Sequence, residues 1–120
     1  MPILFEIDHA SQFVHARTHG VVSLQDILDY MDAVTIQDAA AYPKLFDATD
    51  GDLQLSDDDM MALGARVSAY AAYDPRGPVA AVAVSEKPVA LIRRFMNLGG
   101  AQRSMRLFSS AREARAWLER

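Results

Sequence analysis

The segment PVAAVAV, residues 78–84, restricts the fold of this chain more than any other feature of its sequence. All seven of its residues are apolar, without the alternation of a strand that has one wet face. A strand of this kind must be covered on both faces, as the central strands of a sheet packed between helices are. The segment therefore predicts a layered α/β domain.

Strand and helix patterns alternate along the rest of the chain. The runs ILFEID (3–8) and QFVHART (12–18) are joined by a short polar turn and predict a β-hairpin that ends at His19-Gly20. Further strands are predicted at 44–49, 78–84 and 103–108. Helices are predicted at 24 to about 40, from Ser56 to near Asp74, from about Ser85 to Gly99, and after Ser110. The order ββαβαβαβα predicts a single α/β domain over residues 1–120, with helices packed on a mixed five-stranded sheet.

Three of these helices begin at a serine that can act as an N-cap. Ser23 is followed by Asp26, a variant of the capping box, and Ser110 by Glu113, a full capping box. Ser56 is expected to cap the second helix. The side chains expected to face the core recur at helical spacing: Leu24, Ile27, Leu28, Met31 and Val34; Met60, Leu63, Val67, Tyr70 and Ala71; Ala114, Trp117 and Leu118.

Composition excludes several classes of protein. The chain has no cysteine, so it cannot contain a disulfide, a thiolate nucleophile or a cysteine-ligated metal. Its apolar runs are far shorter than the ~20 residues of a membrane-spanning helix. The N-terminal MPILFEID lacks the basic segment and the long apolar core of a secretory signal. We therefore expect a cytoplasmic protein with no transmembrane segment.

Charge is divided unevenly between the two halves of the sequence. Residues 1–60 contain twelve acidic and two basic residues, whereas residues 61–120 contain ten basic and four acidic residues. The halves are either complementary solvated faces of one domain, or patches that meet a partner, including a second copy of this chain. The net charge of −4 argues against nucleic acid as a partner.

Six aspartates lie within thirteen residues of the segment FDATDGDLQLSDDD, 46–59. An EF-hand loop counted from Asp50 would need glycine at its sixth position and glutamate at its twelfth, where this chain has Leu55 and Met61. Mg²⁺ held through water by Asp47, Asp50 and Asp52 stays a hypothesis. The alternative is a turn at Asp50-Gly51-Asp52, followed by Asp57–Asp59 at the positive end of a helix dipole.

No nucleophile has a visible base partner, and no phosphate-binding or zinc-protease motif occurs. Two groups of side chains remain as candidates for binding. Arg93, Arg94, Arg103 and Arg106 form either ordinary surface charge or a site for an anion or an acidic partner. The other group lines either the core or a pocket for a hydrophobic ligand: Met60, Met61, Met96, Met105, Tyr70 and Tyr73.

The order ββαβαβαβα, the segment from Leu45 to Leu63, and the motifs SEKPVALIRRFMNL and SSAREARAWL resemble the STAS and SpoIIAA-like superfamily of anti-sigma-factor antagonists, and within it small bacterial STAS/SEC14-like proteins. The resemblance implies a strand-end aspartate followed nine residues later by a phosphorylatable serine at the start of the second helix. Asp47 and Ser56 have this offset. The chain departs from the D-S-S-G-like motif, since Leu55 precedes the serine and Asp57 and Asp58 follow it.

Three hypotheses follow. The first is a non-enzymatic STAS-like module that binds a protein partner, or itself as a homodimer, in the bacterial cytoplasm and without a cofactor. Its contact surface would contain Ser56 to Met60 (with Asp57, Asp58 and Asp59), Arg66 and Tyr70, and Ser56 would be its regulatory phosphosite. The second hypothesis is a carrier of a lipid or a small hydrophobic ligand, and the third is a magnesium-assisted enzyme that uses Asp47, Asp50 and Asp52.

Overall fold

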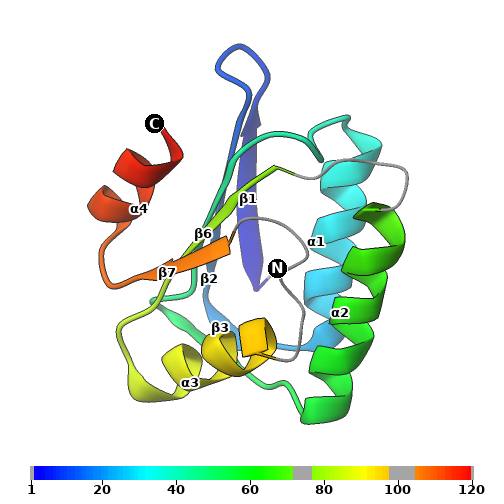
Figure 1. Cartoon of the computed structure of the whole chain (residues 1–120), viewed down its shortest axis with the longest axis vertical. Coiled ribbons are helices and arrows are strands. Elements are labelled where there is room, and N and C mark those ends of the chain that lie inside the picture. The colour runs from blue at the N-terminus through cyan, green and yellow to red at the C-terminus, as the bar shows by residue number, and fades with distance from the viewer. Residues whose placement is uncertain (1, 72–76, 98–104, 120) are drawn as a thin grey trace.

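The computed structural model describes residues 2–71, 77–97 and 105–119 (Figure 1). The elements in chain order are β1 (Ile3–Asp8), β2 (Phe13–Thr18), β3 (Gly20–Val22), α1 (Leu24–Ile36), β4 (Lys44–Asp47), β5 (Gly51–Leu53), α2 (Asp57–Ala71), β6 (Val79–Val82), α3 (Glu86–Phe95), β7 (Met105–Phe108) and α4 (Ala111–Leu118).

The main sheet has five strands in the order β1-β2-β4-β6-β7. β1 pairs antiparallel with β2, while β2, β4, β6 and β7 run parallel to one another. This arrangement confirms the predicted hairpin and the predicted mixed sheet with a parallel centre.

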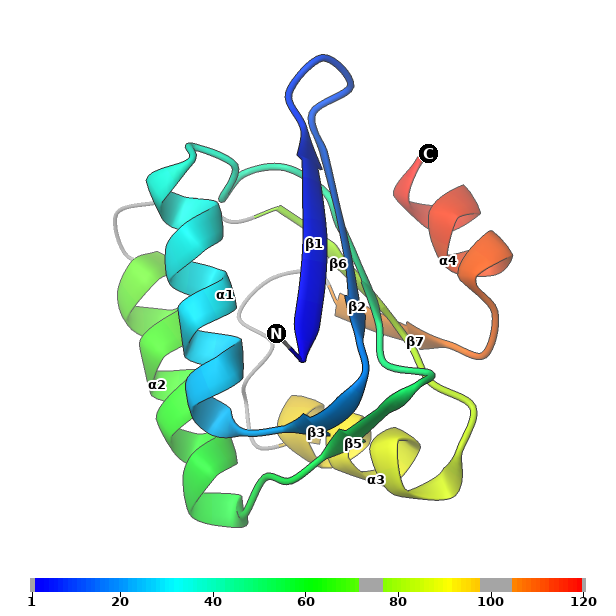
Figure 2. The ribbon, with the colours of Figure 1, turned by 180° about the vertical axis from the view of Figure 1, so that it is seen from behind.

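Helices cover both faces of the sheet, so β6 is buried at all four of its residues. Among the described helices, α1, α2 and α3 lie on one face and α4 lies on the other (Figures 1 and 2). Side chains of β6 alternate between two clusters: Ala81 belongs to the larger core, and Ala80 and Val82 pack with Leu45 and Ala114 on the α4 side. The predicted strand covered on both faces is confirmed at Val79–Val82, but the predicted bounds of 78–84 are too long, since the strand ends at Val82 and Val84 is 62% exposed.

The predicted helix caps are present. Ser23 and Asp26 form a complete capping box at α1, in which the Ser23 side chain accepts a hydrogen bond from the Asp26 N–H and the Asp26 carboxylate accepts one from the Ser23 N–H. Ser110 accepts a hydrogen bond from the Glu113 N–H at the start of α4, but the reciprocal bond from the Ser110 N–H to the Glu113 carboxylate, which the predicted full capping box requires, is not formed between these two described residues. Helix α1 ends at Ile36, earlier than the predicted residue 40, because Asp38 adopts a left-handed backbone with φ of 59°. The expected ends of α2 and α3, near Asp74 and at Gly99, lie outside the described residues.

A second, two-stranded parallel sheet was not predicted. In it β3 pairs with β5, and Gly20, Val21 and Val22 lie opposite Gly51, Asp52 and Leu53 (Figure 2). Asp50 is in the expected turn, but the prediction that Gly51 and Asp52 also belong to it is wrong, since both are strand residues. Three-residue strands are too short to show a period-2 pattern, so the sequence carries no signal for them.

Gly51 fits this small sheet because it has no side chain. A Cβ atom at this position would lie 2.1 Å from Oγ1 of Thr18, which is itself only 2% exposed.

We expect Gly51→Ala to lower the free energy of unfolding by about 1–3 kcal/mol, the usual cost of overpacking a buried site. Urea denaturation measures the change. Val21→Ala, at an exposed position of the same sheet, is the control and should stay within about 0.5 kcal/mol of wild type; an equal effect of both would refute the steric explanation.

Candidate functional site

The candidate site lies where β4 ends and the chain passes through β5 to the start of α2. Asp47 is the last residue of β4, and its half-buried carboxylate accepts hydrogen bonds from Thr49, one from the backbone N–H at 3.0 Å and one from the side-chain hydroxyl. In the sheet, Asp47 is in register with Arg17 of β2 and Val82 of β6. The Asp47 carboxylate therefore stabilises the turn that directly follows β4.

Ser56 is exposed and caps α2, as predicted. Its hydroxyl accepts a hydrogen bond from the Asp59 N–H at 3.1 Å, and the Asp59 carboxylate accepts one from the Ser56 N–H at 3.0 Å. The two residues form a capping box that the sequence analysis did not identify. The signal was present, since Ser56-x-x-Asp59 has the same spacing as Ser23-x-x-Asp26.

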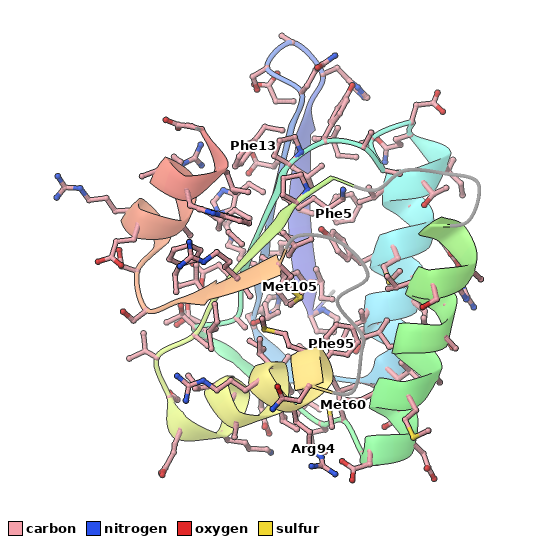
Figure 3. The ribbon with its side chains drawn as sticks, viewed as in Figure 1. Phe5, Phe13, Met60, Arg94, Phe95 and Met105 are labelled. Atoms are coloured by element: carbon pink, nitrogen blue, oxygen red, sulfur yellow. The ribbon has the colours of Figure 1, made fainter. Side chains whose placement is uncertain are left out.

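Asp57 forms a two-pronged ion pair with Arg94 of α3. Nε and Nη2 of Arg94 donate to Oδ1 and Oδ2 of Asp57 at 2.6 and 2.5 Å. These hydrogen bonds lower the pKa of the Asp57 carboxyl and raise the pKa of the Arg94 guanidinium. The pair links the start of α2 to the last turn of α3 (Figure 3). From the sequence, Asp57 and Arg94 were expected in separate patches, and the structure brings them together.

Two further ion pairs also connect elements that are distant in the sequence. Lys87 of α3 contacts Asp52 of β5 at 2.8 Å, and Arg66 of α2 contacts Asp32 of α1 at 3.2 Å. The hydrogen bond from Lys87, followed by that from Gln54, lowers the pKa of Asp52. Each ion pair between described side chains therefore joins an acid from the first half of the sequence to a base from the second half.

The prediction that Met60 lies on the contact surface is wrong. It is 2% exposed and belongs to the core, whereas its neighbour Met61 is 61% exposed. Arg66 is partly exposed and is paired with Asp32. The side chain of Tyr70, also expected on this surface, lies outside the described residues, as does Tyr73.

The exposed face of α2 was missed by the sequence analysis. It begins at Asp58 and continues through residues at helical spacing, all exposed and mostly small and apolar: Met61, Ala62, Ala65, Ser68 and Ala69. A search for core-facing periodicity ignores such a face, because alanine is compatible with either side of a helix. The feature that could have identified it is Met61 at an outward position.

The predicted arginine group is not a single patch. Arg93 is exposed on α3, and its neighbour Arg94 is paired with Asp57. Arg106 lies instead on the α4 side of the sheet, where its guanidinium sits over the rings of Phe108 and Trp117 at 5.7 and 5.8 Å from their centroids. Arg103 lies outside the described residues. The sheet therefore separates Arg106 from Arg93 and Arg94.

The magnesium hypothesis gains no support from the part of the chain that the structure describes. Within residues 2–71, 77–97 and 105–119, no group of three or more histidine, aspartate or glutamate side chains is placed to hold a metal ion. Asp47 is hydrogen-bonded to Thr49, and Asp52 is paired with Lys87. None of the described helices is long and apolar enough to cross a membrane.

Comparisons with known proteins give information about the fold. No protein-family model matches the chain, and no curated protein matches it. Among solved structures, an uncharacterized DUF3478-family protein with a SpoIIAA-like fold from Shewanella loihica PV-4 is 19% identical with a TM-score of 0.63, over 97% of this chain and 93% of that one. An anti-sigma factor antagonist from Mycobacterium paratuberculosis is 11% identical with a TM-score of 0.61, over 98% and 95%. This chain therefore has the SpoIIAA-like fold that its resemblance to the STAS superfamily implied.

Proposed function

We propose that this protein is a non-enzymatic interaction module of the bacterial cytoplasm, which binds a protein partner through the exposed face of α2. This α2 face consists of Asp58, Met61, Ala62, Ala65, Ser68 and Ala69. The observation that carries the proposal is that an apolar stripe lies on the outside of a helix whose other side is already packed against the core. Exposed apolar surface that continues along one element is typical of a contact site.

Two further observations support the proposal. An anti-sigma factor antagonist shares the fold over nearly the whole chain, and the name of that protein describes a regulator that acts on another protein. The backbone of the α2 face is also held by the core, because Leu63 and Val67 on the inward side of the helix are buried in it. A rigid helix loses little conformational freedom when a partner binds.

The alanines of the α2 face allow close approach, so a long side chain there should block the partner. We expect Ala65→Arg to weaken partner binding by about tenfold or more, as for a contact near the centre of an interface. The partner would first be isolated by affinity purification with the wild-type chain, and its affinity for each variant measured by calorimetry. Ala90→Arg, at an exposed alanine of α3, is the matched control and should bind as wild type.

If Ala65→Arg and Ala90→Arg bind equally well, the α2 face is not the contact surface. The sedimentation of the wild-type chain alone then tells whether the partner is a second copy. A homodimer formed through α2 would dissociate in Ala65→Arg and persist in Ala90→Arg.

Ser56 has two candidate roles, cap and phosphosite. As a cap alone, Ser56→Ala should cost about 0.5–2 kcal/mol of stability and leave partner affinity unchanged; Ser110→Ala at α4 is the matched cap control. As a phosphosite, Ser56 would carry a phosphate that gains from the helix dipole and is repelled by the carboxylates of Asp57 and Asp59. Phosphopeptide mapping of protein from native cells tests this second role, and Ser56→Asp should then change partner affinity.

The ion pair between Asp57 and Arg94 predicts a specific pH dependence. The pKa of Asp57 in the folded chain lies below its ordinary value of 3.8, so the pair stabilises the fold above that value and this stabilisation is lost as pH falls through the lowered pKa. Asp57→Asn should therefore be less stable than wild type at neutral pH and equally stable at the acid end. Urea titrations of Asp57→Asn, Arg94→Gln and the double variant across this range measure the coupling, and a coupling independent of pH would contradict the assignment.

A further inference from the structure

A cavity of about 120 Å³ lies between the main sheet and helices α1, α2 and α3. The sheet contributes side chains that share one face, among them Phe46, Ala81 and Met105, and the helices contribute Met31, Leu63 and Phe95. Phe95 of α3 and Met105 of β7, two of the lining side chains, are partly exposed (Figure 3). The cavity is separate from the α2 face described above, because it is lined by the inward side of that helix.

Among the described residues that line this cavity, all are apolar except Lys44 and Tyr30. Lys44 is 5% exposed, and its ammonium donates to the backbone carbonyl oxygens of Ala40 and Tyr42 at 2.6 and 2.8 Å. Tyr30 is 8% exposed and packs its ring against Phe5 and Phe46. The Lys44 ammonium is therefore engaged by backbone carbonyl oxygens of the protein itself. Water in such a space finds few hydrogen-bond partners, and an apolar occupant is favoured over it.

The volume of the cavity limits the size of the molecule that it can bind. Drug-sized ligands occupy pockets of roughly 300–1,000 Å³, whereas a cavity of about 150 Å³ lined by leucine, isoleucine and phenylalanine takes up benzene. We propose that this cavity binds a small uncharged apolar molecule, of the size of one aromatic ring or a short aliphatic chain. A lipid with long acyl chains exceeds the space, so the ligand class expected here is smaller than that of the lipid-carrier hypothesis.

Binding is tested with toluene as the probe and with the purified full chain. Toluene should cause saturable shifts of the methyl resonances of Met31 and Met105 in NMR spectra, and it should raise the melting temperature, because a ligand of the folded state stabilises it. Naphthalene, with two rings, should cause neither effect in the wild-type chain. Absence of a saturable shift with toluene, or saturable binding of naphthalene, would overturn the proposal.

Two variants connect the binding to this cavity. Ala81→Leu adds an isopropyl group to the cavity wall and should lower toluene affinity by at least about tenfold, since the space is then occupied. Its matched control is Ala80→Val, on the same strand but on the α4 side of the sheet, which should retain wild-type affinity. Toluene binding that is unchanged in Ala81→Leu, or lost equally in Ala80→Val, would place the probe elsewhere.

The second variant covers the case in which Ala81→Leu does not fold. Met105→Ala enlarges the cavity at its partly exposed end and should make the chain competent to bind naphthalene. Val82→Ala, which removes volume from the opposite face of the sheet, is its control and should still exclude naphthalene. Naphthalene binding in neither or in both of these variants would contradict the assigned cavity.

Discussion

The burial of β6 on both faces is the constraint on which the rest of the structure depends. Because every side chain of β6 must meet a covering layer, the chain has to supply helices to both sides of the sheet. The two sides are covered differently. On one side α4 packs directly against Ala80 and Val82, whose small side chains let the helix approach, and on the other side three helices enclose a larger volume around Ala81. A cavity remains on this second side, between helices α1, α2 and α3 and the small side chain of Ala81.

The ion pairs have a secondary role, and they explain the uneven charge of the sequence. The acids that form these pairs lie on α1, β5 and the start of α2, and the bases that meet them lie on α2 and α3. All three pairs are partly exposed, so each contributes little to the total stability. They connect α2 to α1 and α3, and α3 to β5, at elements whose positions are already set by packing in the core. The charge division is therefore explained in part by contacts within one domain.

Strongly patterned features could be predicted from the sequence. The hairpin, the buried strand and the caps Ser23, Ser56 and Ser110 were predicted correctly, because periodicity and capping are local properties of the chain. The pairing of β3 with β5 could not be predicted, since it depends on two three-residue strands that are distant in sequence. The same holds for the ion pair of Asp57 with Arg94, which are 37 residues apart and come together only when α2 and α3 pack.

The aspartate cluster shows why composition alone is a poor guide to a site. A metal site requires carboxylates that converge on one point and are not already engaged. Four of the six aspartates have partners of their own within the chain, and these partners are Thr49, Lys87, Arg94 and Ser56. They lie on a strand end, a second sheet and a helix start, and each stabilises its own element. Of the two that remain, Asp50 lies in a turn, whereas Asp58 stands at the head of the exposed α2 face. The position of Asp58 on that face, and not the density of carboxylates, is the reason why we include it in the proposed contact surface.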